Sequence, residues 1–394
     1  MLSRSWSGLS SILPKRFVSS LACGIVGLPN VGKSSLFNAL TDSSVPSENY
    51  PFCTIDPSTG IAVLDDERLQ QVASLCRSSR VFPAAFTLVD IAGLIQGASK
   101  GEGLGNKFLS NIRSVDAVVH VVRCFEDSAI THVGSSVDPV RDVLTIESEL
   151  LLADLQTVER AFEKAAKVRG EDSTLRKETL QAISVALVDG IPAREFVRKR
   201  EEERLPLSVS QETFLSSLQL LSSKEVMYVA NVGETDDGHV QALADFLESR
   251  SGPSRPSLVS VPVRQEVERK DVENDDNMSD NEKEELLLEA AFPPSKLPLL
   301  LKEAFSTLSL QTYFTAGEKE ARAWVIRKGD TAPKAAGKIH SDFERGFIKA
   351  SVIGWKELVE CGNLATARDR GMVRLEGKEY IVKDGDVIEF FFNV

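Results

Sequence analysis

The apolar positions of the chain form short runs and longer helical stripes. Short runs predict strands at 21–26, 86–89, 117–122 and 226–230. A helix is predicted from Ser34 onward, because Leu36, Phe37 and Leu40 fall on one face. The strand at 21–26 therefore leads into a helix through one short loop.

A longer helical pattern occupies the middle of the chain. Between 138 and 169, apolar residues recur at helical spacing, and after Gly170 a second run continues to Leu187. We expect antiparallel helices, and packing between them explains the apolar stripe without a binding site. The positions expected to face outward include the basic residues Arg160, Lys164, Lys167, Arg169, Arg176, Lys177, Arg194, Arg198, Lys199 and Arg200.

Two later segments carry opposite charge. Residues 266–289 are rich in Asp and Glu and poor in aromatics, which predicts a solvated, partly disordered loop. The C-terminal region instead places basic residues among aromatics such as Tyr313, Trp324 and Phe347. Basic groups beside aromatics suit an RNA surface, although we expect most of these rings in the core of a small domain.

Composition is that of a soluble globular protein with two or three domains: 394 residues, 42% hydrophobic and 26% charged. No apolar run reaches membrane-spanning length, so no transmembrane segment is expected. We also expect no membrane among the partners. The five cysteines are odd in number and lack metal-ligand spacing, which indicates a reducing compartment. The net charge of -12 argues against a nonspecific coat for nucleic acid.

The first 21 residues have a different composition. They contain Arg4, Lys15 and Arg16 and many serines, and no acidic residue precedes Asp42. This composition is typical of an organelle transit peptide. Import into the mitochondrial matrix is the first expectation and import into the plastid stroma the second, while a disordered tail on a cytoplasmic protein is the alternative.

Residues 27–34 fit the pattern G-x-x-x-x-G-K-[ST], in which backbone N–H groups at a helix N-terminus cradle a triphosphate. Gly27 and Gly32 leave room for the phosphates. Lys33 is expected to reach the outer phosphates, and the hydroxyl of Ser34 is expected to bind Mg²⁺. The residues expected to contact nucleotide here are Asn30, Val31, Gly32, Lys33, Ser34 and Ser35.

A second phosphate-site pattern follows the strand at 86–89. Asp90 and Gly93 form D-x-x-G, in which the aspartate holds Mg²⁺ through water and the glycine N–H approaches the terminal phosphate. Thr54 lies between the two motifs and is the candidate for a second hydroxyl ligand of Mg²⁺. The metal ligands expected are therefore Ser34, Thr54 and Asp90.

Together, these motifs resemble the YchF group of Obg-related P-loop NTPases, the Obg-like ATPases. The resemblance rests on residues 27–34, 51–55, 90–94 and 97–106, and on 311–317, 380–387 and 392–394 near the C-terminus. It covers nearly all of the chain from Cys23 to Val394 and weakens around 264–292, and residues 1–20 suggest an organelle-targeted form.

The resemblance implies an α/β fold: a Ras-like P-loop NTPase domain with an inserted helical coiled-coil arm and a C-terminal β-grasp TGS domain. The boundaries expected are 1–20 for the transit peptide, 21–138 and 223–304 for the discontinuous NTPase domain, 139–222 for the arm and 305–394 for the TGS domain. The sequence does not decide whether the chain dimerises, and a monomer is the working expectation.

The residue that would position the attacking water differs from that of ordinary GTPases. Leu94 follows D-x-x-G where many GTPases carry a Gln, and it has neither donor nor acceptor. The family resemblance suggests His132 as a mobile replacement, although a loop histidine is commonly just solvated. It also suggests that Asn30 helps to hold K⁺ beside the phosphates. We therefore expect His132, Lys33 and Asn30 to be catalytic, whereas His120 lies in an apolar strand and is expected in the core.

The motif that would recognise the nucleotide base also differs from that of ordinary GTPases. Where GTPases carry N-K-x-D, the strand at 226–230 leads into Asn231, Val232 and Glu234. Val232 lacks the lysine stem that packs over guanine, and Glu234 carries its carboxylate one methylene further out than Asp. Because a site built to bond one base edge rejects the other base, this change removes the discrimination for guanine. Residues 264–268 also replace the usual small-residue loop near the base.

Three functions remain open at this stage. The first is Mg²⁺-dependent hydrolysis of ATP, with nucleotide state controlling binding to the ribosome or ribosomal RNA. The second is the same architecture working with GTP. The third is an RNA- or ribosome-binding module gated by nucleotide with negligible turnover, which the loss of water positioning at Leu94 makes plausible.

Overall fold

The computed structural model describes residues 22–41, 58–93, 104–127, 136–167, 171–233, 238–250, 256–275, 277–290 and 292–393. Thr54, Leu94, His132 and Glu234 lie outside these ranges. Among the described residues, no helix combines the length and the apolar character needed to cross a bilayer.

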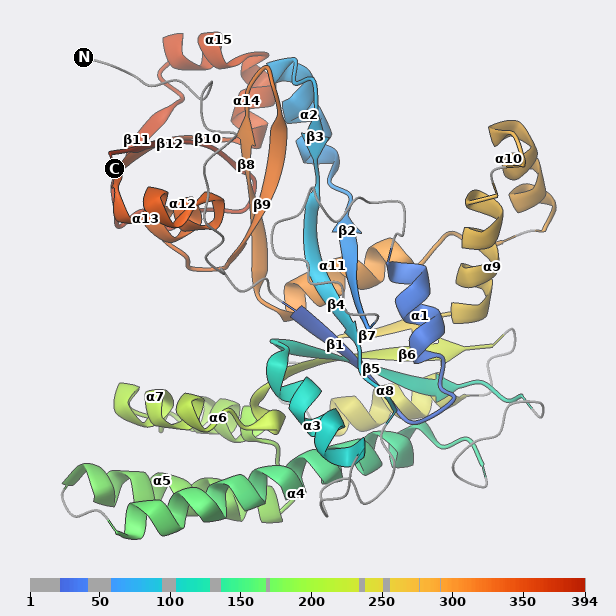
Figure 1. The fold of residues 1–394 in the computed structure, drawn as a ribbon, viewed down its shortest axis with the longest axis vertical. Helices are drawn as coiled ribbons and strands as arrows, with labels where there is room; N and C mark the ends of the chain where they lie inside the picture. Colours follow the sequence, from blue (N-terminus) through green and yellow to red (C-terminus); the bar gives the residue numbers. More distant parts are fainter. Residues whose placement is uncertain are drawn as a thin grey trace.

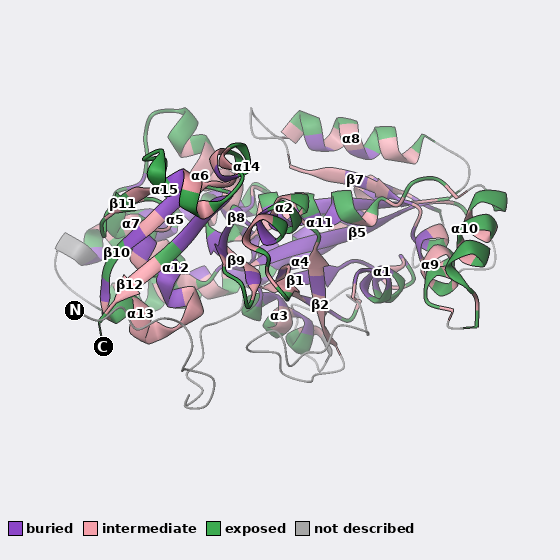
Figure 2. Cartoon of the chain, turned by 90° about the horizontal axis from the view of Figure 1, so that it is seen from above, coloured by how far each residue is buried: buried purple, intermediate pink, exposed green. Residues whose placement is uncertain are grey.

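The first sheet has six strands in the order β2(Thr59–Leu64), β4(Ala84–Asp90), β1(Ala22–Val26), β5(Ala117–Cys124), β6(Glu225–Val232), β7(Leu258–Val261). Neighbours are parallel except β2, which runs antiparallel to β4. All eight residues of β5 are buried, as expected for a central strand covered on both faces (Figure 2). The strands expected at 86–89, 117–122 and 226–230 are all present.

The helices that pack on this sheet include α1(Lys33–Leu40), α3(Leu104–Ser114), α8(His239–Arg250), α9(Val263–Glu273) and α11(Leu297–Thr307). Leu36 and Phe37 of α1 and Phe305 of α11 share one apolar core with β1, β4 and β5. The sheet thereby holds the loop between β1 and α1 at the carboxyl ends of parallel strands, where α/β folds bind ligands.

The inserted arm consists of α4(Pro139–Ala166), α5(Glu171–Val188), α6(Ala193–Glu202), α7(Val209–Leu218) and the short 3-10 helix η3(Leu221–Ser223). It projects from the sheet, and α5 returns alongside α4 (Figure 1). Asp138 caps α4 by accepting a hydrogen bond from the N–H of Arg141, with Pro139 in the first turn. The helices expected at 138–169 and 175–187 are present, and α6 and α7 add a second pair.

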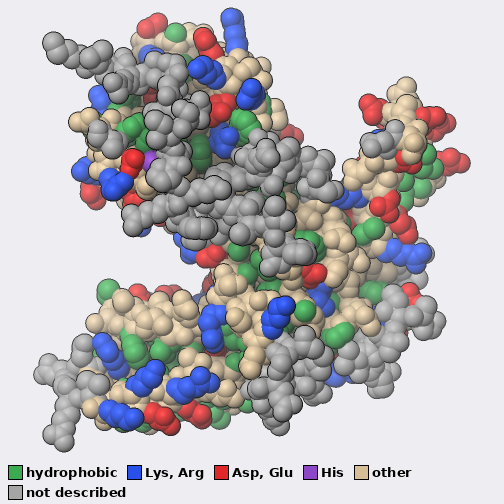
Figure 3. Space-filling view, in the orientation of Figure 1, with side chains coloured by type: hydrophobic (Ala, Val, Ile, Leu, Met, Phe, Trp, Pro, Cys, Tyr) green, Lys and Arg blue, Asp and Glu red, His purple; other side chains and the backbone are tan. Residues whose placement is uncertain are grey.

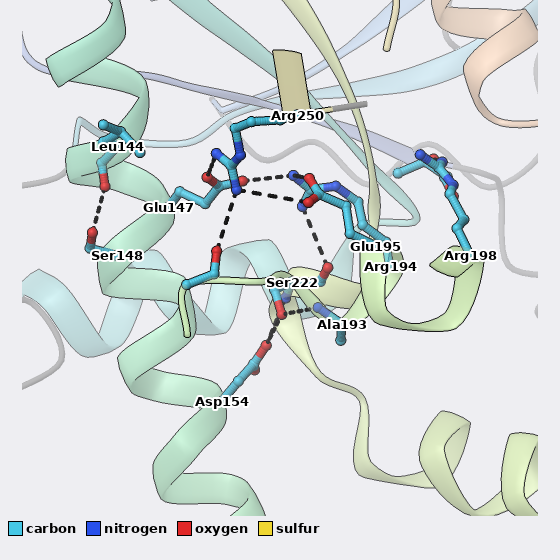
Figure 4. A network of polar contacts seen from close by, with 12 residues as sticks. Leu144, Glu147, Ser148, Asp154, Ala193, Arg194, Glu195, Arg198, Ser222 and Arg250 are labelled. Carbon is cyan, nitrogen blue, oxygen red and sulfur yellow. Dashed lines mark hydrogen bonds and ion pairs between the residues drawn. The ribbon is translucent and has the colours of Figure 1, made fainter. Parts of the chain in front are cut away.

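A buried ion-pair cluster joins the arm to the first sheet's α8 (Figure 4). Glu147 of α4 accepts hydrogen bonds from Arg194 of α6 at 2.8 Å and from Arg250 of α8. The side chain of Arg194 is only 8% exposed, so the expectation that Arg194 faces outward is wrong. The physical reason is the buried carboxylate of Glu147, which pairs with the Arg194 guanidinium, while Lys177, Arg198 and Arg200 are half-buried.

The second sheet belongs mainly to the C-terminal region. Its order is β11(Arg374–Glu376), β10(Phe347–Gly354), β12(Asp386–Phe392), β8(Leu310–Ala316), β9(Ala321–Arg327), β3(Val81–Phe82). The remaining helices of this region are α12(Ala332–Ile339), α13(Ser341–Arg345), α14(Trp355–Cys361) and α15(Leu364–Asp369). Tyr313, Phe314 and Phe347 are buried, which confirms that core packing accounts for these rings.

One strand of the second sheet comes from the N-terminal half of the chain. β3 pairs in parallel with β9, and the preceding helix α2(Glu67–Cys76) packs in the same apolar cluster as Phe314, Ile353 and Val387. The two sheets are therefore joined by more than the chain connection through α11.

The acidic stretch at 266–289 is not a loop, and that expectation is wrong. It contains most of α9 and all of α10(Asp280–Glu289). A capping box between Ser279 and Glu282 starts α10, and a salt bridge of 2.9 Å between Arg264 and Glu268 lies along α9. Acidic side chains gather on this hairpin, at the upper right of Figure 3. The solvated character is confirmed for α10, which has no buried residue, whereas Glu266 in α9 is 3% exposed.

Candidate functional site

The loop between β1 and α1 has the geometry of a phosphate cradle. Gly32 has φ 96° and Asn30 has φ 61°, so the loop turns through the left-handed region just before α1. A Cβ on Gly27 would lie 2.5 Å from the carbonyl oxygen of Val121, and one on Gly32 would collide with the amide of Asn231. Only glycine fits at these two positions, and the N–H groups of the first turn of α1 remain available to an anion.

Lys33 is the cation of this cradle. It is 7% exposed, and its Nζ donates a hydrogen bond of 2.7 Å to the carbonyl oxygen of Leu28, within the loop itself. Burial lowers the pKa of Lys33, and the nearby charge of Asp90 opposes this shift. The ammonium group is thus held inside the loop, where a phosphate oxygen would replace a weaker carbonyl partner.

Ser34 and Asp90 lie together beside the loop, as the sequence motifs predict. Ser34 Oγ donates to Asp90 Oδ2 at 2.7 Å, whereas Asp90 Oδ1 is buried and has no hydrogen-bond partner. A buried carboxylate oxygen without a partner is costly unless a ligand supplies one. A hydroxyl and a carboxylate are the oxygen donors that Mg²⁺ prefers, so these residues fit the metal that the motif implies.

Gly93 lies against the same loop. A Cβ there would be 2.9 Å from Lys33 Nζ and 3.1 Å from the backbone nitrogen of Pro29. The D-x-x-G glycine and the phosphate-loop lysine, sixty positions apart in the sequence, therefore meet at one point. The absence of a side chain lets the backbone at Gly93 approach the space where the outer phosphates would lie.

Asn231 holds the loop from the other side. Its Nδ2 donates to the carbonyl oxygen of Val31 at 2.9 Å, and its Oδ1 accepts from the N–H of Val263 at 3.3 Å. Asn231 is 6% exposed, so it ties the phosphate loop to the start of α9. Val232 packs instead against the apolar cluster beneath α8. The structure therefore places Asn231 at the phosphate loop and directs Val232 into packing.

Of the other residues expected at the site, some are placed by the structure and some lie outside the residues it describes. Val31 is buried in the loop, and Asn30 and Ser35 are exposed beside it. Thr54, His132 and Glu234 lie outside the described residues, so their expected roles stay predictions. His120 is 5% exposed, and its ring lies 5.5 Å from that of Tyr228. Burial lowers the pKa of His120 to about 4, and the expectation that it belongs to the core is confirmed.

Sequence reasoning missed Arg123 and Lys270. Arg123 is 1% exposed at the end of β5 and donates to the carbonyl oxygens of Phe125 and Asp127, both at 3.1 Å. Lys270 of α9 donates to the carbonyl oxygens of Asn38, Ala39 and Thr41, at the end of α1. Arg123 could have been found from the sequence, because it is a charged residue at the end of an apolar strand. No local sequence pattern marks Lys270.

Two family models match the chain. A model described as a 50S ribosome-binding GTPase matches residues 22–191, and the YchF-GTPase C-terminal model, described as a protein of unknown function, matches residues 310–393. The expected fold class, a P-loop domain with a helical insertion and a TGS-like C-terminal domain, is thereby confirmed.

Curated relatives match almost the full length of the chain. The ribosome-binding ATPase YchF of Bacillus subtilis is 47% identical over 381 residues, covering 95% of this chain and 100% of the relative. Obg-like ATPase 1 of Gallus gallus is 39% identical, covering 96% of this chain and 94% of the relative.

A solved structure, that of the Schizosaccharomyces pombe YchF GTPase, matches with a TM-score of 0.77 and 34% identity, covering 95% of this chain and 99% of that one. Because near-complete coverage accompanies this identity across both the phosphate loop and the C-terminal domain, the chain belongs to the YchF family of Obg-like P-loop ATPases.

Proposed function

We propose that this chain hydrolyses ATP with Mg²⁺, and that its nucleotide state controls its binding to the ribosome. The observation that carries the first part is the pairing of Ser34 with Asp90, whose second oxygen is buried without a partner, beside the buried cation of Lys33. These groups suit a triphosphate and its metal, and relatives over nearly the whole chain are named ATPases.

Each residue has a distinct task in this proposal. Lys33 binds the outer phosphate oxygens, the first turn of α1 supplies N–H donors, and Ser34 and Asp90 hold the metal. When bound, Mg²⁺ would neutralise charge that develops on the phosphoryl oxygens. Asn231 keeps the loop in shape from behind. Lys33→Ala is expected to abolish nucleotide binding in calorimetry.

ATP is the favoured nucleotide because the N-K-x-D pattern is absent. Asn231 is engaged with the phosphate loop, and the next residue, Val232, packs into an apolar cluster and supplies no stem over a base. A working GTPase is the second candidate, since the related solved structure is titled a GTPase. Calorimetric titration with each nucleotide and Mg²⁺ separates the two. GTP binding at least tenfold tighter than ATP, a difference of about 1.4 kcal/mol, would overturn the ATP proposal.

Turnover is a separate question from binding. Leu94 cannot orient water, so we propose that His132 does so and that K⁺ beside Asn30 assists. His132→Ala should lower kcat while leaving nucleotide affinity intact. Turnover that is indifferent to exchanging Na⁺ for K⁺ would remove the cation from the proposal. Negligible turnover of the unaltered protein in K⁺ buffer would favour the nucleotide-gated binding module.

Ribosome binding is proposed for the arm and the C-terminal domain. The relatives are named ribosome-binding, and Lys and Arg side chains lie along the arm, across a hollow from the C-terminal domain (Figure 3). Arg160, Lys164, Lys167 and Arg176 are exposed on α4, at its end and on α5. Replacing these four by Glu should abolish cosedimentation with ribosomes, whereas Glu159→Lys with Glu163→Lys on the same helix should not weaken it.

We also propose import into mitochondria, with plastids as the second destination. The support is the basic, serine-rich and acid-poor composition of residues 1–21. A fusion of residues 1–25 to a fluorescent protein should be imported, and Arg4→Glu with Arg16→Glu should prevent import. A full-length tagged protein that stays in the cytoplasm would contradict this proposal.

A further inference from the structure

The segment between the two phosphate motifs leaves the first sheet and enters the C-terminal domain. β2 runs outward, α2 and β3 pack with the C-terminal sheet, and β4 returns to the nucleotide site. One strand, β4, thus has Ala84 in the apolar cluster of the C-terminal domain and Asp90 beside Ser34. At about 3.3 Å per residue, its seven residues span roughly 20 Å.

The outer end of this segment is firmly attached. Leu69, Val72 and Ala73 of α2 are buried in one cluster with Phe314 and Val387. The backbone of β3 pairs with β9, Ser79 N donates to Glu318 O at 3.0 Å, and Ala321 N donates to Arg80 O at 2.9 Å. α2 therefore completes the core of the C-terminal sheet, and the attachment is part of a packed interior.

A polar clamp adds to this attachment. Arg68 of α2 donates to Asp384 Oδ2 at 2.6 Å and to Thr312 Oγ1 at 3.1 Å. Asp384 also accepts from the N–H of Thr312 at 3.0 Å. Gly385 lies between this clamp and Trp355, because a Cβ there would collide with the indole ring and lie 3.3 Å from Arg68 Nη1.

The inner end of the segment is equally constrained. β4 lies between β1 and β2 in the first sheet, with Phe86 and Leu88 in its core. Asp90 and Gly93, at its end, are the groups that would respond to a metal and a terminal phosphate. Packed elements move as units, so a shift at Asp90 is carried along the strand to Ala84.

We propose that residues 58–93 act as a lever that couples nucleotide occupancy to the C-terminal domain. This inference rests on the proposed nucleotide binding. Filling the phosphate site moves α2 and β3 and changes the contacts of Arg68, Asp384 and Trp355. Thermodynamic linkage requires the converse, so a partner bound to the C-terminal domain changes nucleotide affinity by the same factor.

Hydrogen–deuterium exchange of the full-length protein, with and without a saturating non-hydrolysable ATP analogue and Mg²⁺, tests the lever. Calorimetry on the same samples measures binding independently. We expect altered exchange at 22–41 and 84–93, which include the phosphate loop and β4. We also expect it at 310–323 and 381–389, which belong to the C-terminal domain and not to the phosphate site. Binding without any change beyond residue 309 overturns the lever alone, whereas absence of binding overturns the proposed function together with the lever.

Arg68→Met supplies the test of the route. It should keep nucleotide affinity within about threefold while the exchange response at 381–389 falls to less than a fifth of its normal size. Arg327→Met is the matched control, because Arg327 pairs with Asp116 at 2.9 Å and joins the same two parts of the molecule outside residues 58–93. The control should retain the response. Asp384→Asn weakens the same clamp from the other side should Arg68→Met not fold, and a full response in both clamp variants overturns the route.

Discussion

At the residue scale, the phosphate site concentrates polar groups that are incompletely paired. Asp90 Oδ1 is buried without a partner, and the ammonium of Lys33 has a loop carbonyl as its hydrogen-bond partner. Groups in this condition cost stability in the empty protein and gain most when a ligand arrives. Gly27 of the loop and Gly93 beside it are equally constrained, since neither has room for a side chain.

Ser34→Ala is expected to remove the dependence of ATP binding on Mg²⁺. The hydroxyl of Ser34 lies 2.7 Å from Asp90, and its loss removes one oxygen donor and the orientation of the other. Affinity with Mg²⁺ should fall by about 10- to 100-fold. Titration in EDTA is the internal control, and there the variant should bind like the unaltered protein. An equal loss with and without metal would contradict the assignment.

His120→Gln tests the pH dependence of stability. The folded-state pKa of His120 is lowered to about 4 by burial, whereas the unfolded value is near 6.5. Between these values the unfolded chain binds a proton that the folded chain does not. The contribution of His120 to the unfolding free energy is therefore fully present above pH 6.5. About 3 kcal/mol of it is lost as pH falls toward 4.

Urea unfolding of both proteins at pH 7.5, 6 and 5 measures this effect. The stability difference between unaltered protein and variant should shrink or reverse as pH falls. Parallel stabilities at all three values would show that folding does not lower the pKa of His120.

At the element scale, Asp154 organises the junction between the arm and β6. From α4 it accepts hydrogen bonds from Leu221 N, Ser222 N and Ser222 Oγ, at 2.7, 2.8 and 2.6 Å. Burial raises the pKa of this carboxyl group, while the bonds from Ser222 and Leu221 oppose the shift. One side chain thereby caps η3 and connects it to the middle of α4.

Asp154→Ala is expected to destabilise the protein by about 2–4 kcal/mol, because it leaves buried N–H groups without acceptors. Asp154→Asn keeps one acceptor oxygen and should cost less. Chemical unfolding monitored by circular dichroism measures both. A loss below about 0.5 kcal/mol for Asp154→Ala would mean that water replaces the carboxylate.

Helices and strands were predictable where local signals agreed with the tertiary structure. The strands at 86–89, 117–122 and 226–230 follow from short apolar runs. The helices at 138–169 and 175–187 follow from apolar residues at helical spacing. The acidic stretch at 266–289 was mispredicted because charge dominated its composition. Lys270 packs onto the end of α1 and the capping box starts α10, so tertiary contacts and a short capping motif outweigh the composition.

At the scale of the whole molecule, three parts are joined by contacts distant in sequence. Glu147, Arg194 and Arg250 connect the arm to the first sheet, while β3 and α2 connect the first sheet to the C-terminal domain. The nucleotide domain therefore contacts both the arm and the C-terminal domain, and this arrangement suits the proposed dependence of ribosome binding on nucleotide.

Glu147→Gln tests the connection to the arm. Removing this buried charge leaves Glu195, 3.8 Å from both guanidinium groups, as the counter-charge of Arg194 and Arg250. We expect a loss of about 3–5 kcal/mol in unfolding free energy. The same change in an Arg194→Met background should cost at least 1 kcal/mol less, because one of the two positive charges is gone. Equal losses in both backgrounds would show that the cluster does not act as a unit.

The sequence by itself determined the identities of the chemical groups. The glycines, Lys33, Ser34, Asp90 and Gly93 were recognisable because phosphate binding demands these residue types at fixed spacing within a strand, a loop and a helix. The family and the order of the parts followed from the same motifs.

Only the tertiary structure decided which distant groups meet. The inward turn of Arg194, the tie between Asn231 and Val31, and the entry of α2 and β3 into the C-terminal core depend on contacts between residues from tens to more than two hundred positions apart. Local patterns cannot specify such contacts, because they form only when separate elements bury their apolar surface together and bring these polar groups within reach.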